Sequence, residues 1–101
     1  MNVRILEAAE QELREAMEYY ENSRVGLGVQ FHDRVNEAML AIGRAPWQFP
    51  LYEGKRRLRR EFRRARVVRF PYIVVFEPRE SEVLVVAVAH TGRRPAYWDR
   101  Q

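Results

Sequence analysis

Arg24-Val25-Gly26-Leu27-Gly28 separates two segments in which apolar residues recur every three or four positions. Glycine readily adopts backbone conformations that other residues avoid, so two glycines this close together favour a tight turn. Helical spacing of Leu, Ala, Met and Tyr runs from Leu6 to about Asn22 before the turn, and a similar apolar stripe runs from Leu27 to about Arg44 after it. Helices joined by so short a turn lie antiparallel, side by side. The sequence therefore predicts a helical hairpin in the N-terminal half of the chain.

Segments typical of β-strands flank the hairpin. Residues 2–5 alternate polar and apolar side chains, which predicts a short edge strand. Later in the chain, residues 65–68 and 72–76 are rich in β-branched and aromatic side chains, and 83–89 is a nearly continuous apolar run with many valines. A run that is apolar on both sides is typical of a central strand. We therefore expect one α+β domain over residues 1–101, with the order β-α-α-β-β-β.

The loop that follows the second predicted helix is aromatic. Pro46 and Pro50 each disfavour helix at the residue before them, so the helix ends here. Trp47 and Phe49 lie between the two prolines. We expect both aromatic side chains to fill the core.

Composition limits the classes of function. The chain has 47% hydrophobic and 32% charged residues, the balance of a folded domain. It has no cysteine, which excludes disulfides, a thiol nucleophile and a cysteine-based zinc site. His32 has no second histidine at ligand spacing, so we expect neither a metal nor a cofactor. Without a signal-peptide pattern or a membrane-length apolar run, we expect a cytoplasmic protein that does not bind membranes.

Charge is distributed unevenly along the chain. Residues 1–45 hold five arginines against eight acids, whereas residues 46–101 hold thirteen basic residues against six acids. Nine of those thirteen lie between Lys55 and Arg69. Because most residues of this run are charged, its pattern does not decide whether it forms a strand or a loop. Unless this run is only a solvated face, it should attract an anionic partner, either nucleic acid or an acidic peptide. The residues expected to bind such a partner are Lys55, Arg56, Arg57, Arg59, Arg60, Arg63, Arg64 and Arg66.

An ordered set of short motifs resembles the RelE/ParE superfamily of toxins. The motifs are Tyr19-Tyr20-Glu21, Gly26-Leu27-Gly28 with Phe31, Pro46 with Phe49-Pro50, Arg69-Phe70-Pro71-Tyr72, and Ala87-Val88-Ala89-His90 followed by Arg93 to Trp98. Together they run from about Leu6 to Trp98. The resemblance implies a helical hairpin on an antiparallel sheet, in the toxin of a type II toxin–antitoxin system. It also implies a partner, a cognate antitoxin encoded beside the toxin that wraps around it and silences it.

Two activities are known on this fold, so the resemblance leaves alternatives. ParE-like toxins inhibit growth by binding and poisoning DNA gyrase, which needs a surface and no catalytic residues. RelE-like toxins are enzymes that cut messenger RNA on the ribosome without a metal, using basic side chains with His, Glu or Tyr. We favour the ParE side, because the long helical hairpin and its two motifs look more like that branch. An inactive toxin-fold module that only binds partners, or a non-toxic nucleic-acid-binding protein, are further possibilities.

For the RelE-like alternative, the resemblance places catalytic candidates near the C-terminus. His90 would transfer a proton, Arg93 or Arg94 would hold the phosphate, and Tyr97 would stack on a base or donate a proton. Each has a purely structural alternative. His90 would be a hydrogen-bonded strand end, the two arginines would pair with helix acids, and Tyr97 with Trp98 would dock the tail onto the sheet.

Overall fold

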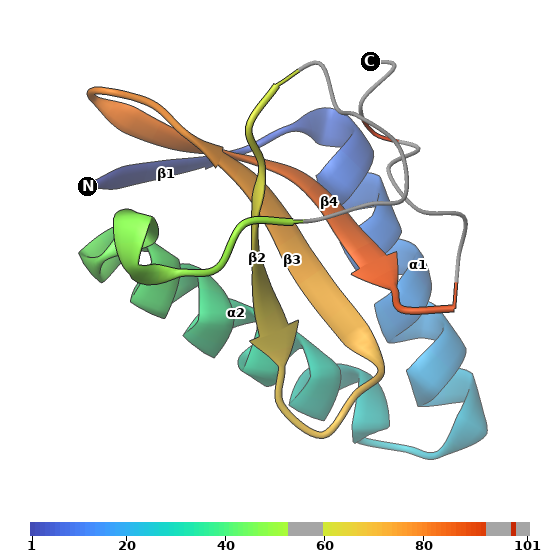
Figure 1. Ribbon diagram of the computed structural model, residues 1–101. Helices are drawn as coiled ribbons and strands as arrows, with labels where there is room; N and C mark the ends of the chain where they lie inside the picture. Colours follow the sequence, from blue (N-terminus) through green and yellow to red (C-terminus); the bar gives the residue numbers. More distant parts are fainter. Residues whose placement is uncertain (53–59, 93–97, 99–101) are drawn as a thin grey trace.

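Two helices cover one face of a four-stranded sheet (Figure 1). The computed structural model describes residues 1–52, 60–92 and 98. Its elements are β1 (Asn2–Ile5), α1 (Glu7–Ser23), α2 (Leu27–Arg44), the short 3-10 helix η1 (Pro46–Gln48), β2 (Arg63–Val67), β3 (Tyr72–Pro78) and β4 (Glu82–His90). The expected order β-α-α-β-β-β is confirmed. No helix in the described part of the chain is both long and apolar enough to cross a membrane.

The sheet has the strand order β1-β4-β3-β2. The predicted antiparallel arrangement holds for the pairs β2–β3 and β3–β4. At the other side of β4, β1 is added in parallel, with Val3 opposite Val83, so the sheet is mixed. Parallel neighbours need a long crossover connection, and here both helices and two strands provide it. Nothing in a four-residue alternating strand specifies which neighbour it joins or in which direction, so this pairing was not predictable.

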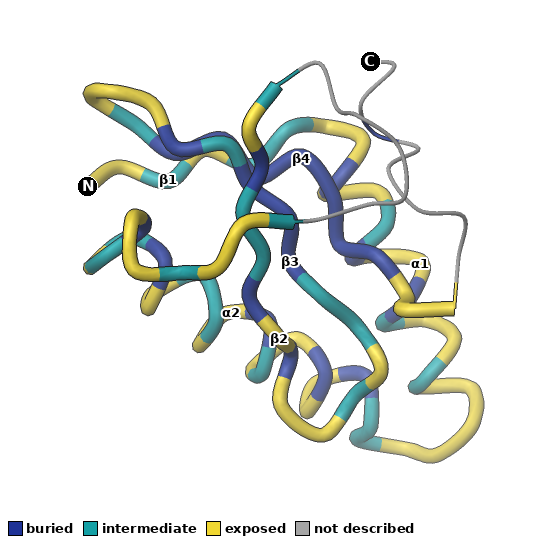
Figure 2. The backbone as a smooth tube through the Cα atoms, viewed as in Figure 1, coloured by how far each residue is buried: buried dark blue, intermediate teal, exposed yellow. Residues whose placement is uncertain are grey.

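The central strand β4 is buried on both faces, as its sequence predicted (Figure 2). On the helix side, Val85 and Val88 belong to a cluster that includes Phe31 of α2. On the opposite side, Leu84 and Val86 belong to a second cluster; its other members are Phe62, Val75, Ala87, Ala89 and Trp98. The sheet therefore has an apolar layer on each face, one made with helices and one made with loop residues.

The structure explains why the turn of the hairpin contains two glycines, Gly26 and Gly28. A Cβ on Gly28 would lie 2.6 Å from the backbone oxygen of Met17, so α1 and α2 approach too closely there for any other residue. Gly26 has φ +89°, a left-handed conformation that favours glycine. The Glu21 carboxylate reaches from the last turn of α1 and accepts hydrogen bonds from the N–H groups of Gly26 and Gly28, at 3.0 Å each. It thereby satisfies backbone donors at the start of α2 that no side chain of the N-cap residue serves.

The aromatic loop after α2 is only partly as expected. Phe49 packs against the core, with its ring 5.7 Å from that of Phe76. Trp47 is 54% exposed, so the prediction that it fills the core is wrong. Its ring instead lies against the guanidinium of Arg63, at 5.5 Å. The face of an indole ring attracts a cation, so the Arg63 guanidinium gives Trp47 a favourable contact at the surface.

Candidate functional site

His90 ends β4 and is exposed. Its ring stands edge-on to that of Tyr72, with the centroids 5.2 Å apart. The backbone N–H of Gly92 donates to His90 Nδ1 at 2.9 Å, so the neutral ring carries its proton on Nε2. This is the hydrogen-bonded strand end that the structural alternative predicted. Arg93, Arg94 and Tyr97, the other catalytic candidates, lie outside the described residues.

A hollow of about 310 Å³ lies beside His90, between α1 and the end of β4. We call it the acidic hollow, because Glu12 and Glu15 line it together with Ala16, Tyr19, Tyr72, Val88 and His90. Glu12 Oε1 accepts a hydrogen bond of 3.0 Å from the N–H of Val88, beyond the point where β1 stops pairing with β4. Among the lining residues that the structure describes there is no lysine or arginine. The two carboxylates give this part of the hollow a negative charge, which repels a phosphodiester.

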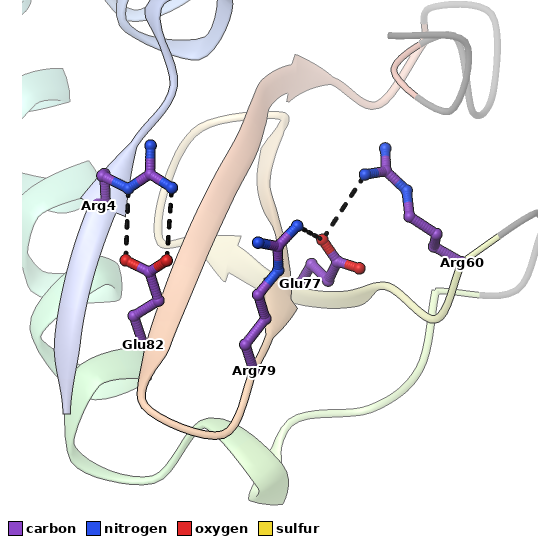
Figure 3. A network of polar contacts seen from close by, with 5 residues as sticks. All are labelled: Arg4, Arg60, Glu77, Arg79 and Glu82. Carbon is purple, nitrogen blue, oxygen red and sulfur yellow. Dashed lines mark hydrogen bonds and ion pairs between the residues drawn. The ribbon is translucent and has the colours of Figure 1, made fainter.

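Two of the predicted partner-binding arginines are engaged within the chain, and Figure 3 shows one of them, Arg60. Arg60 lies 3.7 Å from the Glu77 carboxylate, which Arg79 also contacts, and its guanidinium lies over the Phe62 ring at 5.3 Å. Arg63 donates to the backbone oxygen of Phe49 at 2.6 Å and has only 17% of its side chain exposed. These two arginines therefore stabilise the fold around β2.

Arg64 and Arg66 are placed differently. They alternate along β2 with Ala65 and Val67, which are buried on the helix side, so they lie on the opposite face of the strand. Within the described part of the chain, neither forms an ion pair. Arg66 is exposed, whereas Arg64 is half-buried. The remaining residues of this prediction, Lys55, Arg56, Arg57 and Arg59, lie outside the described residues.

Trp98 docks on the sheet, as the structural alternative for the tail predicted. It is 2% exposed and belongs to the apolar cluster on the face opposite the helices. Its ring centroid lies 4.8 Å from that of Tyr52 and 6.3 Å from that of Phe62. The tail is therefore held against the sheet at this residue.

The sequence did not reveal a second hollow, of about 390 Å³, where the turn between α1 and α2 meets the turn between β2 and β3. We call it the arginine pocket; its lining residues are Tyr20, Arg24, Leu27, Gln30, Arg34, Arg69, Phe70 and Pro71. Its three arginines come from three separate parts of the chain, so no local motif marks them. The one local signal is Arg69, an arginine placed in the break between two strand segments.

Within residues 1–52, 60–92 and 98, no group of three or more His, Asp and Glu side chains is placed to hold a metal ion.

The fold resembles that of a solved toxin–antitoxin component. A chain from the chromosomal ParDE TA system of P. aeruginosa superposes with a TM-score of 0.74, covering 89% of this chain and 95% of that one. The two share 12% sequence identity, so the likeness concerns the fold. No curated protein matches this sequence.

The sequence itself carries a more specific match. The family model described as the ParE toxin of type II toxin–antitoxin system, parDE, matches residues 3–95. The chain therefore belongs to the ParE toxin family. The resemblance to RelE/ParE toxins that the motifs indicated is confirmed, on the ParE side.

Proposed function

We propose that this protein is a growth-inhibiting toxin that acts by binding and poisoning DNA gyrase. The acidic hollow is the observation that supports this choice over RNA cleavage. An RNA-cleaving site must gather positive charge around the scissile phosphate, whereas the carboxylates Glu12 and Glu15 are among the described residues that line the hollow beside His90. Membership of the ParE family supports the same choice. Gyrase is a cytoplasmic enzyme, so we propose that the toxin acts in the cytoplasm.

Two assays with the purified chain separate the alternatives. Supercoiling of relaxed plasmid by gyrase should be inhibited, while messenger RNA on translating ribosomes should remain intact. His90→Ala should leave gyrase inhibition unchanged, since a binding surface does not need a proton-transferring side chain. Cleaved messenger RNA, abolished by His90→Ala, would instead identify a RelE-like endoribonuclease. Activity in neither assay would leave an inactive interaction module.

Pulse labelling in cells tests the same proposal without purified components. The chain is induced in cells that lack an antitoxin, and DNA and protein synthesis are followed separately over the first minutes. A gyrase poison should reduce DNA synthesis first. An early loss of protein synthesis with DNA synthesis intact would contradict the proposal.

We also propose that a cognate antitoxin neutralises the toxin, and that Arg64 and Arg66 help to bind it. Both are cations on the face of β2 turned away from the helices, without ion pairs in the described structure. An acidic antitoxin segment would supply the missing partners. The double variant Arg64→Glu/Arg66→Glu should weaken capture of the protein encoded by the neighbouring gene and reduce the salt dependence of the complex. Arg14→Glu, on the exposed side of α1, is the matched control and should leave capture intact.

A further inference from the structure

We propose that the arginine pocket is a binding site for a phosphate group. The pocket lies at the end of the molecule where the two turns come together (Figure 1), and the rings of Tyr20 and Phe70, 4.9 Å apart, connect them. It is separate from the acidic hollow and from the arginines of β2. The inference therefore does not depend on whether the target of the toxin is gyrase.

Three elements each contribute one guanidinium to the pocket. Arg24 is the C-cap residue of α1, Arg34 lies in α2, and Arg69 lies in the turn between β2 and β3. Arg34 forms an ion pair of 3.2 Å with Glu37, one turn along the same helix. In the described part of the chain, Arg24 and Arg69 have no ion pair. Like charges repel one another, and the one counter-charge among the described ion pairs of these three arginines is Glu37, so the arrangement favours a further anion between them.

The number of donors indicates phosphate as the chemical class of the anion. One guanidinium already serves both oxygens of a carboxylate through a bidentate contact. The pocket is lined by three arginines and by Gln30, whose side-chain amide can donate as well. A phosphate group, with its larger charge and additional oxygens, uses such a set more fully than a carboxylate.

The remaining walls of the arginine pocket leave room for the rest of a phosphorylated ligand. Leu27, Phe70 and Pro71 supply apolar surface, and the volume of about 390 Å³ falls within the range of about 300–1,000 Å³ for ligand pockets. An apolar wall beside a cluster of arginines suits a sugar or base next to the bound phosphate. Nucleotides and nucleic-acid backbones present the same group, so both are candidate sources of it.

The backbone at Arg69 is an independent indication that this side chain serves a ligand. Arg69 has φ +73°, and among the described residues it is the one non-glycine residue with a positive φ. A residue with a Cβ is strained in this conformation, where glycine would be accommodated freely. Strained backbone of this kind is concentrated at ligand-binding sites. A turn whose only requirement was to connect β2 to β3 would be more stable with glycine here.

The test is a titration of the full chain with inorganic phosphate, followed by NMR in phosphate-free buffer at low salt. The signals to follow are the Gln30 side-chain amide and the Nε–H groups of Arg24 and Arg69. We expect saturable shifts of these signals in the parent protein. Arg24→Gln and Arg69→Gly should each weaken phosphate binding about tenfold, because each removes a charge-assisted contact. Signal dispersion in the same spectra reports whether each variant is folded.

Arg14→Gln is the matched control, because it removes the same charge from an exposed arginine of α1 outside the pocket. It should leave the affinity for phosphate unchanged. If phosphate causes no saturable shift, or if Arg14→Gln weakens binding as much as the pocket variants do, the proposal is wrong. A triglutamate peptide that displaces phosphate at lower concentration than phosphate itself binds would also overturn it, in favour of an acidic protein segment.

A second titration identifies the source of the phosphate. A labelled single-stranded oligonucleotide is compared with a mononucleotide, each against the parent, Arg24→Gln and Arg69→Gly. Tighter binding of the oligonucleotide, lost in both pocket variants, would assign the site to a nucleic-acid backbone. Equal binding of the two per phosphate would assign it to a small phosphorylated molecule.

Discussion

Two hollows of opposite charge lie on the two sides of one aromatic cluster. Tyr19 and Tyr72 line the acidic hollow, whereas Tyr20 and Phe70 line the arginine pocket. The ring centroid of Tyr20 lies 5.3 Å from that of Tyr19 and 6.1 Å from that of Tyr72, so the aromatic walls of the two hollows are continuous. The chain carries a net charge of +4, yet the hollow beside its histidine is acidic. The sign of charge at a site thus follows from which elements converge there and not from the charge of the whole chain.

Removing the ring at the centre of the shared wall should have the largest effect. Phe31 is fully buried and its ring lies within 5.2 Å of those of Tyr20, Phe70 and Tyr72. Phe31→Ala should lower the free energy of unfolding by about 3–5 kcal/mol, because the cavity forfeits all of these contacts. Urea denaturation followed by circular dichroism measures the loss. The control is Val25→Ala, at a 90% exposed position, which should be nearly neutral. Equal stabilities of the two variants would show that the hollows have no common wall.

A smaller effect is expected from the acidic hollow alone. Glu12→Ala leaves the Val88 N–H without its acceptor at the edge of β4, and should cost about 1–3 kcal/mol. Hydrogen exchange of the Val88 amide should accelerate in parallel. Glu15→Ala is the matched control, since Glu15 lines the same hollow but accepts only from the exposed Gln11 side chain. If both variants behaved alike, the carboxylates would contribute only charge.

The arginine pocket predicts a change of opposite sign. Arg69→Gly should raise the free energy of unfolding by about 1 kcal/mol, because it relieves the left-handed backbone at φ +73°. Arg66→Gly, the same substitution within β2, should lower it, since glycine weakens a strand. Thermal unfolding of both variants, compared with the parent protein, measures the two changes in stability. Destabilisation by both would mean that Arg69 is held by contacts that outweigh its strain.

The smallest effect concerns Tyr20, an aromatic residue that lines the arginine pocket. The pKa of Tyr20 is raised from its ordinary value of 10.0 by burial and by Tyr19, so the unfolded chain loses this proton first as pH rises. The stabilisation from the neutral hydroxyl is complete below about pH 10 and is lost at higher pH. Tyr20→Phe should therefore flatten the alkaline decline in stability, measured by urea denaturation from neutral pH upward. Parallel curves for parent and variant would contradict this.

Much of the fold was predictable because its elements are strongly periodic. The bounds of α2 and β1 match the predicted ones, and the two-sided burial of β4 follows directly from its valines. The parallel pairing of β1 was not predictable, since four residues carry no information about direction. The exposure of Trp47 was missed for a related reason, because a tryptophan between prolines has no periodicity that assigns it to a face.

The sites were less predictable than the fold. A run of arginines reveals charge but not partners, so the sequence could not distinguish Arg63, held by a backbone oxygen, from Arg66, which is exposed. The arginine pocket was missed entirely, since Arg24, Arg34 and Arg69 become neighbours only after the hairpin folds onto the sheet. His90 was a candidate because of the resemblance to RNA-cleaving toxins, but the carboxylates beside it come from another element, α1.

The position of β4 in the sheet has a consequence for synthesis of the protein. This strand separates β1 from β3, so neither the first strand nor the β2–β3 hairpin has its place in the sheet until residues 82–90 have left the ribosome. Helices form from local contacts, but a sheet with such distant pairings assembles late. A partly made chain therefore exposes two helices without the surface they cover. The surfaces to which β4 contributes therefore come into existence together, once this strand has joined its two neighbours.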